Sequence, residues 1–141
     1  MLLAIDVGNT QTVIGLFDES ENLFYQWRIA TRANETQDEK GILLNNLLLS
    51  DGLNAADITA VALSSVVPSC TTSIVEMSRR FLKLDPLIVD FTITKQLKTT
   101  YNHPREIGAD RIVNAVAALK LFGGPIIIVD FGTATTFDLI S

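Results

Sequence analysis

The sequence contains a single cysteine, Cys70, and no cluster of lysine and arginine residues. One cysteine cannot form a disulfide within the chain, and the C-x-x-C spacing of many metal and redox sites is absent. Eleven basic residues against sixteen acidic ones give a net charge of -5. Because nucleic-acid binding requires a basic surface, we do not expect nucleic acid as the main ligand.

Long apolar runs are also missing. No run approaches the roughly 20 residues that a membrane span needs. The apolar start, Met1–Ile5, lacks a basic segment and meets Asp6 too early for a signal peptide. We therefore expect no membrane association and a reducing, cytoplasmic location. With 48 % hydrophobic and 19 % charged residues over a length of 141, the sequence has the composition of about one folded domain.

Short apolar runs bounded by turn residues predict three consecutive strands, followed by alternating helices and strands. The strands are expected at Leu2–Asp6, Thr12–Phe17, Leu23–Thr31, Ile58–Val67, Leu87–Val89 and Ile126–Val129. The helices are expected at Glu35–Ser50, from Thr71 or Thr72 to Leu82, and at Ala109–Phe122, with a polar irregular stretch at Thr92–Ile107. The order β-β-β-α-β-α-β-α predicts an α/β fold with a mixed five-stranded sheet and helices on its faces.

The end of the sequence repeats its beginning. Residues Ile126–Thr136 align without a gap on Leu2–Thr12, so that Asp130 matches Asp6, Gly132 matches Gly8 and Thr136 matches Thr12. The distance between the copies is far longer than a solenoid repeat, which indicates a duplicated domain. We expect residues 1–123 to form the first domain, Gly123-Gly124-Pro125 to be the boundary, and residues 124–141 to begin a second, truncated copy.

The opening segment has the features of a phosphate-binding hairpin. Gly8 follows the strand that ends at Asp6, where the turn can require a positive φ and a phosphate can approach the backbone. Asn9, Thr10 and Thr12 add neutral donors, and Asp6 can hold Mg²⁺ that bridges to phosphates. The alternative is a plain hairpin, since Gly-Asn is common in type I′ turns. A P-loop motif is absent from the sequence.

A second candidate site is the join between a loop and a helix at Gly108-Ala109. Asp110 is expected in the first helical turn, where a carboxylate can serve only to stabilise the helix start. Alternatively, it can accept the proton of an attacking hydroxyl during phosphoryl transfer. Arg111 can receive an anionic group of the substrate in a bidentate pair.

Three ordered motifs carry a family resemblance that extends from the first residue to the last. They are Asp6-Val7-Gly8-Asn9-Thr10, then Gly108-Ala109-Asp110-Arg111 after Tyr101-Asn102, and finally Asp130-Phe131-Gly132-Thr133-Ala134-Thr135-Thr136. The sequence thereby resembles type III pantothenate kinase, of the acetate-kinase/hexokinase/actin-type superfamily. The resemblance implies a ribonuclease-H-like, actin-like ATPase fold. It also implies ATP-dependent phosphorylation of pantothenate to 4′-phosphopantothenate, the first step of coenzyme A biosynthesis.

The resemblance also implies roles for individual residues. Asp110 is then the general base, and Thr133 contacts an ATP phosphate. Asp130 holds K⁺ or NH₄⁺, while Asp6 contacts Mg²⁺ or a similar divalent ion through phosphate or water. The ATP phosphate loop comprises Asp6, Val7, Gly8, Asn9, Thr10, Gln11, Thr12 and Val13. The pantothenate pocket comprises Tyr101, Gly108, Ala109, Asp110 and Arg111. The family works as a homodimer.

Two other interpretations stay open from the sequence. One is a non-catalytic regulatory member of the same fold, although the three carboxylates Asp6, Asp110 and Asp130 favour an enzyme. The other is a different enzyme of the superfamily, such as a sugar kinase or a polyphosphate phosphatase. Because the family has a second domain that carries the adenosine site, we expect the 141-residue chain alone to have little activity.

Overall fold

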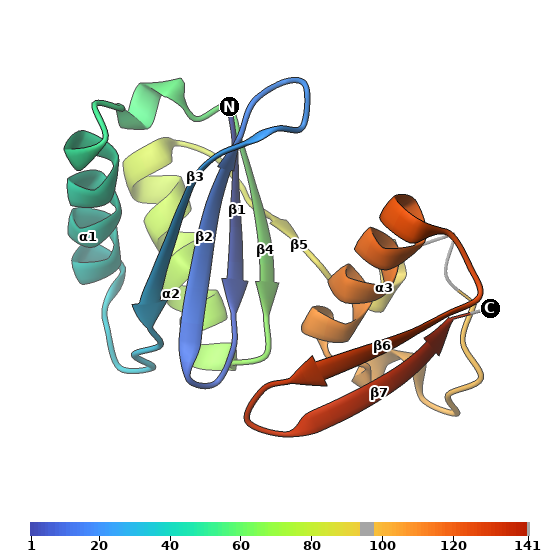
Figure 1. Ribbon diagram of the computed structural model, residues 1–141. Helices are drawn as coiled ribbons and strands as arrows, with labels where there is room; N and C mark the ends of the chain where they lie inside the picture. Colours follow the sequence, from blue (N-terminus) through green and yellow to red (C-terminus); the bar gives the residue numbers. More distant parts are fainter. Residues whose placement is uncertain (94–97, 141) are drawn as a thin grey trace. The chain divides into compact units, whose positions relative to one another are not determined.

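The computed structural model describes residues 1–93 and 98–140 and divides into two compact units, Met1–Ile88 and Val89–Ser141 (Figure 1). The expected irregular stretch Thr92–Ile107 includes residues 94–97, which lie outside the described residues. Among the described residues, no helix is both long and apolar enough to cross a membrane.

The first unit is built on a mixed five-stranded sheet in the order β3-β2-β1-β4-β5. Strands β1, β2 and β3 form the expected antiparallel meander, and β4 and β5 run parallel to β1. The α/β class and the mixed sheet are therefore confirmed. The strands are β1 (Leu2–Val7), β2 (Gln11–Phe17), β3 (Leu23–Ala30), β4 (Ala60–Ser65) and β5 (Leu87–Ile88).

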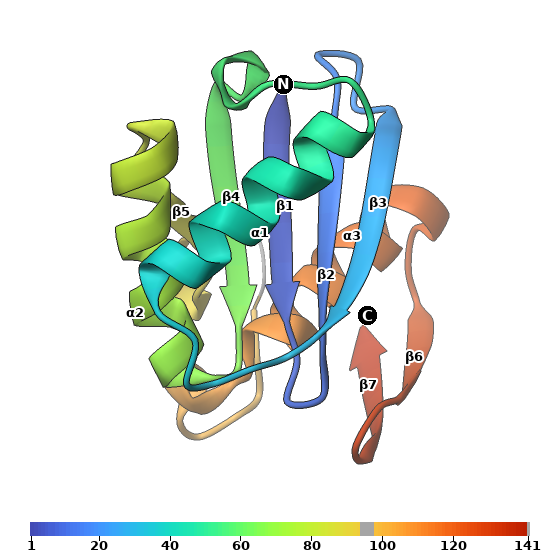
Figure 2. The same ribbon diagram turned by 90° about the vertical axis from the view of Figure 1, so that its left-hand side faces the viewer.

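Two helices of this unit, α1 (Gln37–Ser50) and α2 (Pro68–Met77), contact each other and cover one face of the sheet (Figure 2). Successive side chains of a strand point to opposite faces, so alternate residues of β1 reach the helices. These are Leu3, Ile5 and Val7, which are almost completely buried. The unit thus has one hydrophobic core beneath the helices.

Helix α1 begins with a capping box. The Thr36 hydroxyl accepts the backbone N–H of Glu39, and the Glu39 carboxylate accepts the backbone N–H of Thr36. This hydrogen bond to Thr36 holds the pKa of Glu39 below its ordinary value of 4.5. At the other end of α1, the Asp51 carboxylate accepts the indole N–H of Trp27 on β3 at 2.8 Å. Both ends of the helix are therefore fixed by side chains.

The approach of α1 to the segment after α2 depends on Gly41. A Cβ atom at this position would lie 2.4 Å from the ring of Phe81. Phe81 belongs to Ser78–Leu82, a π-helical turn that continues α2. The Phe81 ring therefore packs directly against the backbone of α1 at Gly41.

The expected start of the second helix at Thr71 or Thr72 is wrong. Helix α2 starts at Pro68, because proline suits the first helical position and favours the extended backbone of Val67 before it. The hydroxyls of Thr71 and Thr72 instead donate to the carbonyls of Val67 and Pro68, one turn back in the same helix.

The second unit contains α3 (Ala109–Phe122) and the hairpin of β6 (Ile126–Phe131) and β7 (Thr135–Ile140). The predicted bounds of α3 are confirmed. Helix α3 contacts both hairpin strands, and the compact units divide after Ile88. The expected domain boundary at Gly123-Gly124-Pro125 stays a prediction. That residues 124–141 begin a second domain copy stays a prediction.

The two hairpins differ in register. Val7 pairs with Thr12 in the first hairpin, whereas Phe131 pairs with Thr135 in the second. By strand pairing, Thr135 therefore corresponds to Thr12, and the ungapped match to Thr136 is wrong by one residue. The hairpin face that corresponds to the buried face of the first copy is exposed and apolar. Its large side chains are Ile127, Val129, Phe131, Phe137 and Leu139.

Candidate phosphate and substrate sites

The turn of the first hairpin is tight at Gly8. The Gly8 N–H donates to the Gln11 carbonyl at 3.0 Å, and a Cβ atom on Gly8 would lie 3.2 Å from that same oxygen. Neither Gly8, Asn9 nor Thr10 is among the described residues with a positive φ. The turn is therefore not type I′, and the glycine is favoured by close backbone approach rather than by a left-handed conformation.

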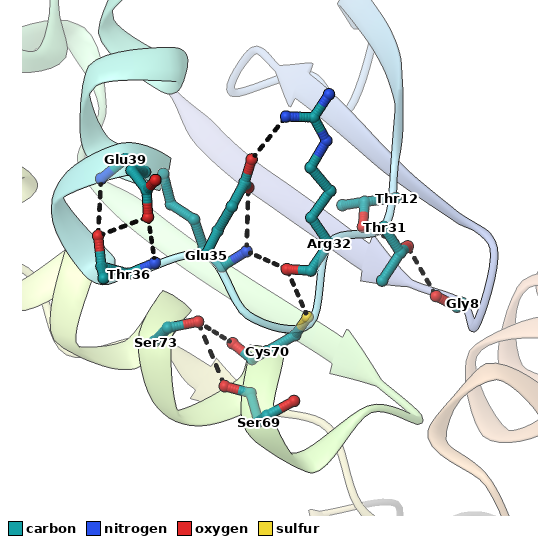
Figure 3. A network of polar contacts seen from close by, with 11 residues as sticks. Gly8, Thr12, Thr31, Arg32, Glu35, Thr36, Glu39, Ser69, Cys70 and Ser73 are labelled. Atoms are coloured by element: carbon teal, nitrogen blue, oxygen red, sulfur yellow. Dashed lines mark hydrogen bonds and ion pairs between the residues drawn. The ribbon is translucent and has the colours of Figure 1, made fainter.

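Thr31, which follows β3, fixes this turn from the side (Figure 3). Its N–H donates to the Thr10 carbonyl at 2.9 Å, and its hydroxyl donates to the Gly8 carbonyl at 2.7 Å. Since that hydroxyl has one proton, the hydroxyl of buried Thr12 donates to Thr31 at 2.9 Å. Two carbonyl oxygens that would repel a phosphate are thus bound by Thr31. Sequence reasoning missed this residue.

Asp6 lies near the C-terminal end of β1, and its side chain is exposed. The parallel register pairs Asp6 with Ser64 of β4, whose hydroxyl donates to Asp6 Oδ1 at 2.8 Å. Ligands of α/β sheets bind outside the carboxyl ends of the strands, where this pair lies. In the sequence, Ser64 stood out only as a hydroxyl residue near the end of an apolar strand, which does not predict a contact with Asp6.

The remaining residues of the predicted phosphate loop divide by burial. Val7 is buried and Val13 is partly buried, so both support the hairpin. Asn9, Thr10 and Gln11 are exposed, and the Gln11 side chain accepts a hydrogen bond from Arg28 at 2.8 Å. The structure therefore brings the predicted loop together as one exposed turn on a buried base.

The chain after Thr31 is held by a polar network (Figure 3). The Arg32 carbonyl accepts Lys40 Nζ at 3.2 Å and the Cys70 thiol at 3.8 Å, while Glu35 pairs with both Arg32 and Lys40. This network joins β3, α1 and α2 next to a small apolar cavity of about 40 Å³. The cavity is lined by Ile5, Thr12, Ile14, Ile29, Ala30, Arg32, Lys40, Leu43, Leu44, Ile74 and Met77.

In the second unit, Asp110 lies in the first turn of α3, as expected. The N-cap residue is Gly108, which has no side chain to accept the first N–H groups, and Ala109 is buried behind it. Asp110 Oδ1 accepts the backbone N–H of Arg111 at 2.8 Å. The helix dipole favours a negative charge at this position. Asp110 therefore helps to begin the helix, and this contact is compatible with a further role of its carboxylate as a base.

The Arg111 side chain contacts two other side chains, those of Asp138 and Tyr101. Its Nε donates to the two carboxylate oxygens of Asp138 at 2.9 and 3.1 Å, and its Nη2 donates to Oδ1 as well. The guanidinium carbon lies 5.1 Å from the centre of the Tyr101 ring. The hydrogen bonds to Asp138 raise the pKa of Arg111 above its ordinary value. Asp138 lies 27 positions along the chain, and no sequence pattern indicated this pairing.

Asp130 on β6 has a side-chain amide and a hydroxyl residue as neighbours. The Asn114 side chain donates to Asp130 Oδ2 at 3.4 Å, and Asp130 pairs across the hairpin with Thr136. Paired residues of antiparallel strands have side chains on the same face. The Thr136 hydroxyl is buried and has no hydrogen-bond partner among the described residues. A carboxylate beside an unpartnered hydroxyl fits a cation with oxygen ligands, and Thr133 lies exposed in the adjoining turn.

The predicted site residues thus form two groups. Residues 6–13 gather on the first hairpin, and the remaining ones belong to the second unit. The residues of each group lie within a single compact unit. The described residues contain no cluster of three or more His, Cys, Asp or Glu side chains that could hold a metal ion.

Comparison with known proteins supplies the family. Residues 2–141 match the profile of the family described as type III pantothenate kinase. A type III pantothenate kinase from Anaeromyxobacter sp. (strain Fw109-5) is 50 % identical over 141 residues, covering 100 % of this chain and 55 % of the relative. One from Bacillus cytotoxicus (strain DSM 22905 / CIP 110041 / 391-98 / NVH 391-98) is 46 % identical, covering 100 % of this chain and 53 % of the relative. The chain therefore spans about half the length of these relatives.

A solved structure supports the fold. A protein from Sinorhizobium meliloti described as a 2-dehydro-3-deoxygalactonokinase matches with a TM-score of 0.57 at 12 % identity. The match covers 100 % of this chain and 50 % of that one. At this identity the likeness bears on architecture alone, and it agrees with the expected fold of actin-like ATPases.

Proposed function

Since the chain belongs to the type III pantothenate kinase family, we propose that the protein phosphorylates pantothenate with ATP and forms 4′-phosphopantothenate, the first step of coenzyme A biosynthesis. The observation that carries this proposal is the succession of Asp110 and Arg111 in the first turn of α3. The half-buried Asp110 carboxylate accepts the backbone N–H of Arg111, and the Arg111 guanidinium is held by Asp138. This pair suits a substrate that has both a hydroxyl and a carboxylate.

In this proposal the first hairpin binds the ATP phosphates. The backbone of Gly8 allows close approach, and Asn9 and Thr10 offer neutral donors. The binding of the Gly8 and Thr10 carbonyls by Thr31 supports this role, because it removes two acceptors from the turn. Thr12 supports the turn from below, and direct contact of its hydroxyl with a phosphate stays a prediction.

Asp110 accepts the proton of the pantothenate hydroxyl as that oxygen attacks the γ-phosphoryl group of ATP. Arg111 binds the pantothenate carboxylate, while Tyr101, Gly108 and Ala109 form the walls of the pocket. Thr133 contacts an ATP phosphate. Phosphoryl transfer requires mainly positioning and charge stabilisation, which these fixed groups supply.

Two cations belong to the proposal. Asp6, whose position is fixed by Ser64, would contact Mg²⁺ through phosphate or water, and Asp130 with Thr136 would hold K⁺ or NH₄⁺. When bound, these ions would offset the negative charge of the phosphates. We further propose that the protein is a cytoplasmic homodimer and that residues 124–141 belong to a second domain copy.

The test of the function is Asp110→Asn in the full-length gene product. Loss of the base should lower kcat for pantothenate phosphorylation by about 10²- to 10⁴-fold. ATP binding, measured by calorimetry, should stay unchanged because the phosphate hairpin is intact. Glu106→Gln removes an exposed acidic group nearby and serves as the matched control.

Two results would contradict the proposal. Near-normal kcat in Asp110→Asn would remove Asp110 as the base. Wild-type protein that phosphorylates a sugar or hydrolyses polyphosphate, and leaves pantothenate unchanged, would favour another enzyme of the superfamily. A wild-type protein that binds ATP and turns over none of these substrates would favour a regulatory member.

A further inference from the structure

The contact between Arg111 and Asp138 has a specific geometry. The carboxylate of Asp138 binds the Nε and Nη2 groups, which form one edge of the guanidinium. Both side chains are shielded, with 25 % and 16 % of their surface exposed. The contact joins the first turn of α3 to the middle of β7. Such a side-on pair fixes both the position and the plane of the guanidinium.

The contact with Asp138 uses one edge of the Arg111 guanidinium. The guanidinium carbon lies over the Tyr101 ring, and Asp138 takes the edge formed by Nε and Nη2. The other edge consists of Nη1 and the outer N–H of Nη2. Two parallel N–H groups are the arrangement that binds a carboxylate in a bidentate manner.

We propose that Asp138 is a positioning residue for substrate binding, which orients the outer edge of Arg111 toward the carboxylate of pantothenate. This inference rests on the proposed function. An arginine side chain loses much rotamer freedom when it is fixed, and here Asp138 imposes that loss before the substrate arrives. Asp138 also balances the charge of Arg111, so Arg111 selects its ligand by hydrogen-bond direction more than by net charge.

A purely structural role predicts a different outcome. If the pair only fastened α3 to β7, its loss would lower the thermal midpoint and the fraction of active protein. The KM for pantothenate would then stay the same. A positioning role instead raises this KM and leaves kcat and the KM for ATP nearly unchanged, because the base and the phosphate hairpin are untouched.

The experiment compares Asp138→Ala and Asp138→Asn in the full-length gene product. We expect Asp138→Ala to raise the KM for pantothenate, and its calorimetric Kd, by about 10-fold or more, as expected for a charged hydrogen bond. Asp138→Asn keeps one acceptor for Nε and should recover part of the loss. Asp85→Asn breaks the exposed pair with Arg79, where Nε and Oδ1 are 2.5 Å apart, and should change neither constant.

The outcomes separate the two proposals. If wild-type protein neither binds nor phosphorylates pantothenate, the proposed function fails, and the role of Asp138 fails with it. If wild-type protein is active and Arg111→Lys raises the KM for pantothenate, an unchanged KM in both Asp138 variants overturns the positioning role alone. A similar loss of kcat in both Asp138 variants with an unchanged KM for pantothenate also overturns it, because that result fits a role in fastening α3 to β7. Thermal midpoints of all variants identify any that fail to fold.

Discussion

At the scale of single residues, the proposed site depends on side chains that support its predicted members. Thr31 fixes the turn at Gly8, Ser64 binds Asp6, and Asp138 binds Arg111. None of these three supporting residues belongs to the motifs themselves. Each of these motif residues is thus held by a partner that lies on another strand or directly after one.

Thr31→Val tests this dependence. Valine keeps the shape and the backbone N–H but loses the hydroxyl, so Gly8 and buried Thr12 each lose a hydrogen-bond partner. We expect the free energy of unfolding to fall by about 1–3 kcal/mol and the KM for ATP to rise. Urea unfolding and steady-state kinetics measure the two effects.

Thr72→Val is the matched control, because Thr72 is exposed on α2 and its hydroxyl bonds only to the preceding turn. Its effect should stay within about 0.5 kcal/mol. Equal losses in the two variants would show that the turn does not depend on the Thr31 hydroxyl.

At the scale of elements, sequence periodicity predicted the order of strands and helices and the bounds of α3. It could not supply the start of α2, because the hydroxyls of Thr71 and Thr72 suggested a helix cap, whereas Pro68 itself occupies the first helical position. Nor could it supply the pairs Asp6–Ser64 and Arg111–Asp138. Their partners lie 58 and 27 positions apart, and only the strand pairing and the packing of α3 bring them together.

The contact between α1 and Phe81 gives a prediction at this scale. Gly41→Ala places a Cβ atom against the ring, and the strain should destabilise the protein by about 1–3 kcal/mol, more than the helix propensity of alanine returns. In a Phe81→Ala background the ring is absent. The same Gly41→Ala change should then stabilise the protein by up to about 1 kcal/mol.

Thermal unfolding of the four proteins in this cycle measures the effect. The reversal of sign is the critical result, because helix propensity alone gives the same sign in both backgrounds. A Gly41→Ala change that stabilises the protein with Phe81 present would refute the steric explanation.

At the scale of the whole molecule, the two compact units differ in how much apolar surface they bury. The large hydrophobic cluster lies entirely between Leu3 and Leu82. In the second unit, the buried apolar residues among those described are Ala109, Ile112 and Ala115. Burial of apolar surface is the main force that stabilises a fold. The first unit therefore has the means to fold by itself.

We accordingly predict that a fragment of residues 1–88 folds cooperatively, whereas a fragment of residues 89–141 does not. Circular dichroism during urea titration should give a sigmoidal transition for the first fragment and a gradual change for the second. Amide exchange should show protection in β1 and β4 of the isolated first fragment. A first fragment without cooperative unfolding would contradict the prediction.

The hydrogen bond between Trp27 and Asp51 has a practical consequence. Trp27 is the single tryptophan of the sequence, and it lies in the first unit, where its indole also stacks on Tyr25. Its fluorescence is therefore an optical reporter of β3 and the end of α1. Emission recorded together with ellipticity on one sample will compare this region with the backbone as a whole, so the protein carries its own local probe without any added label.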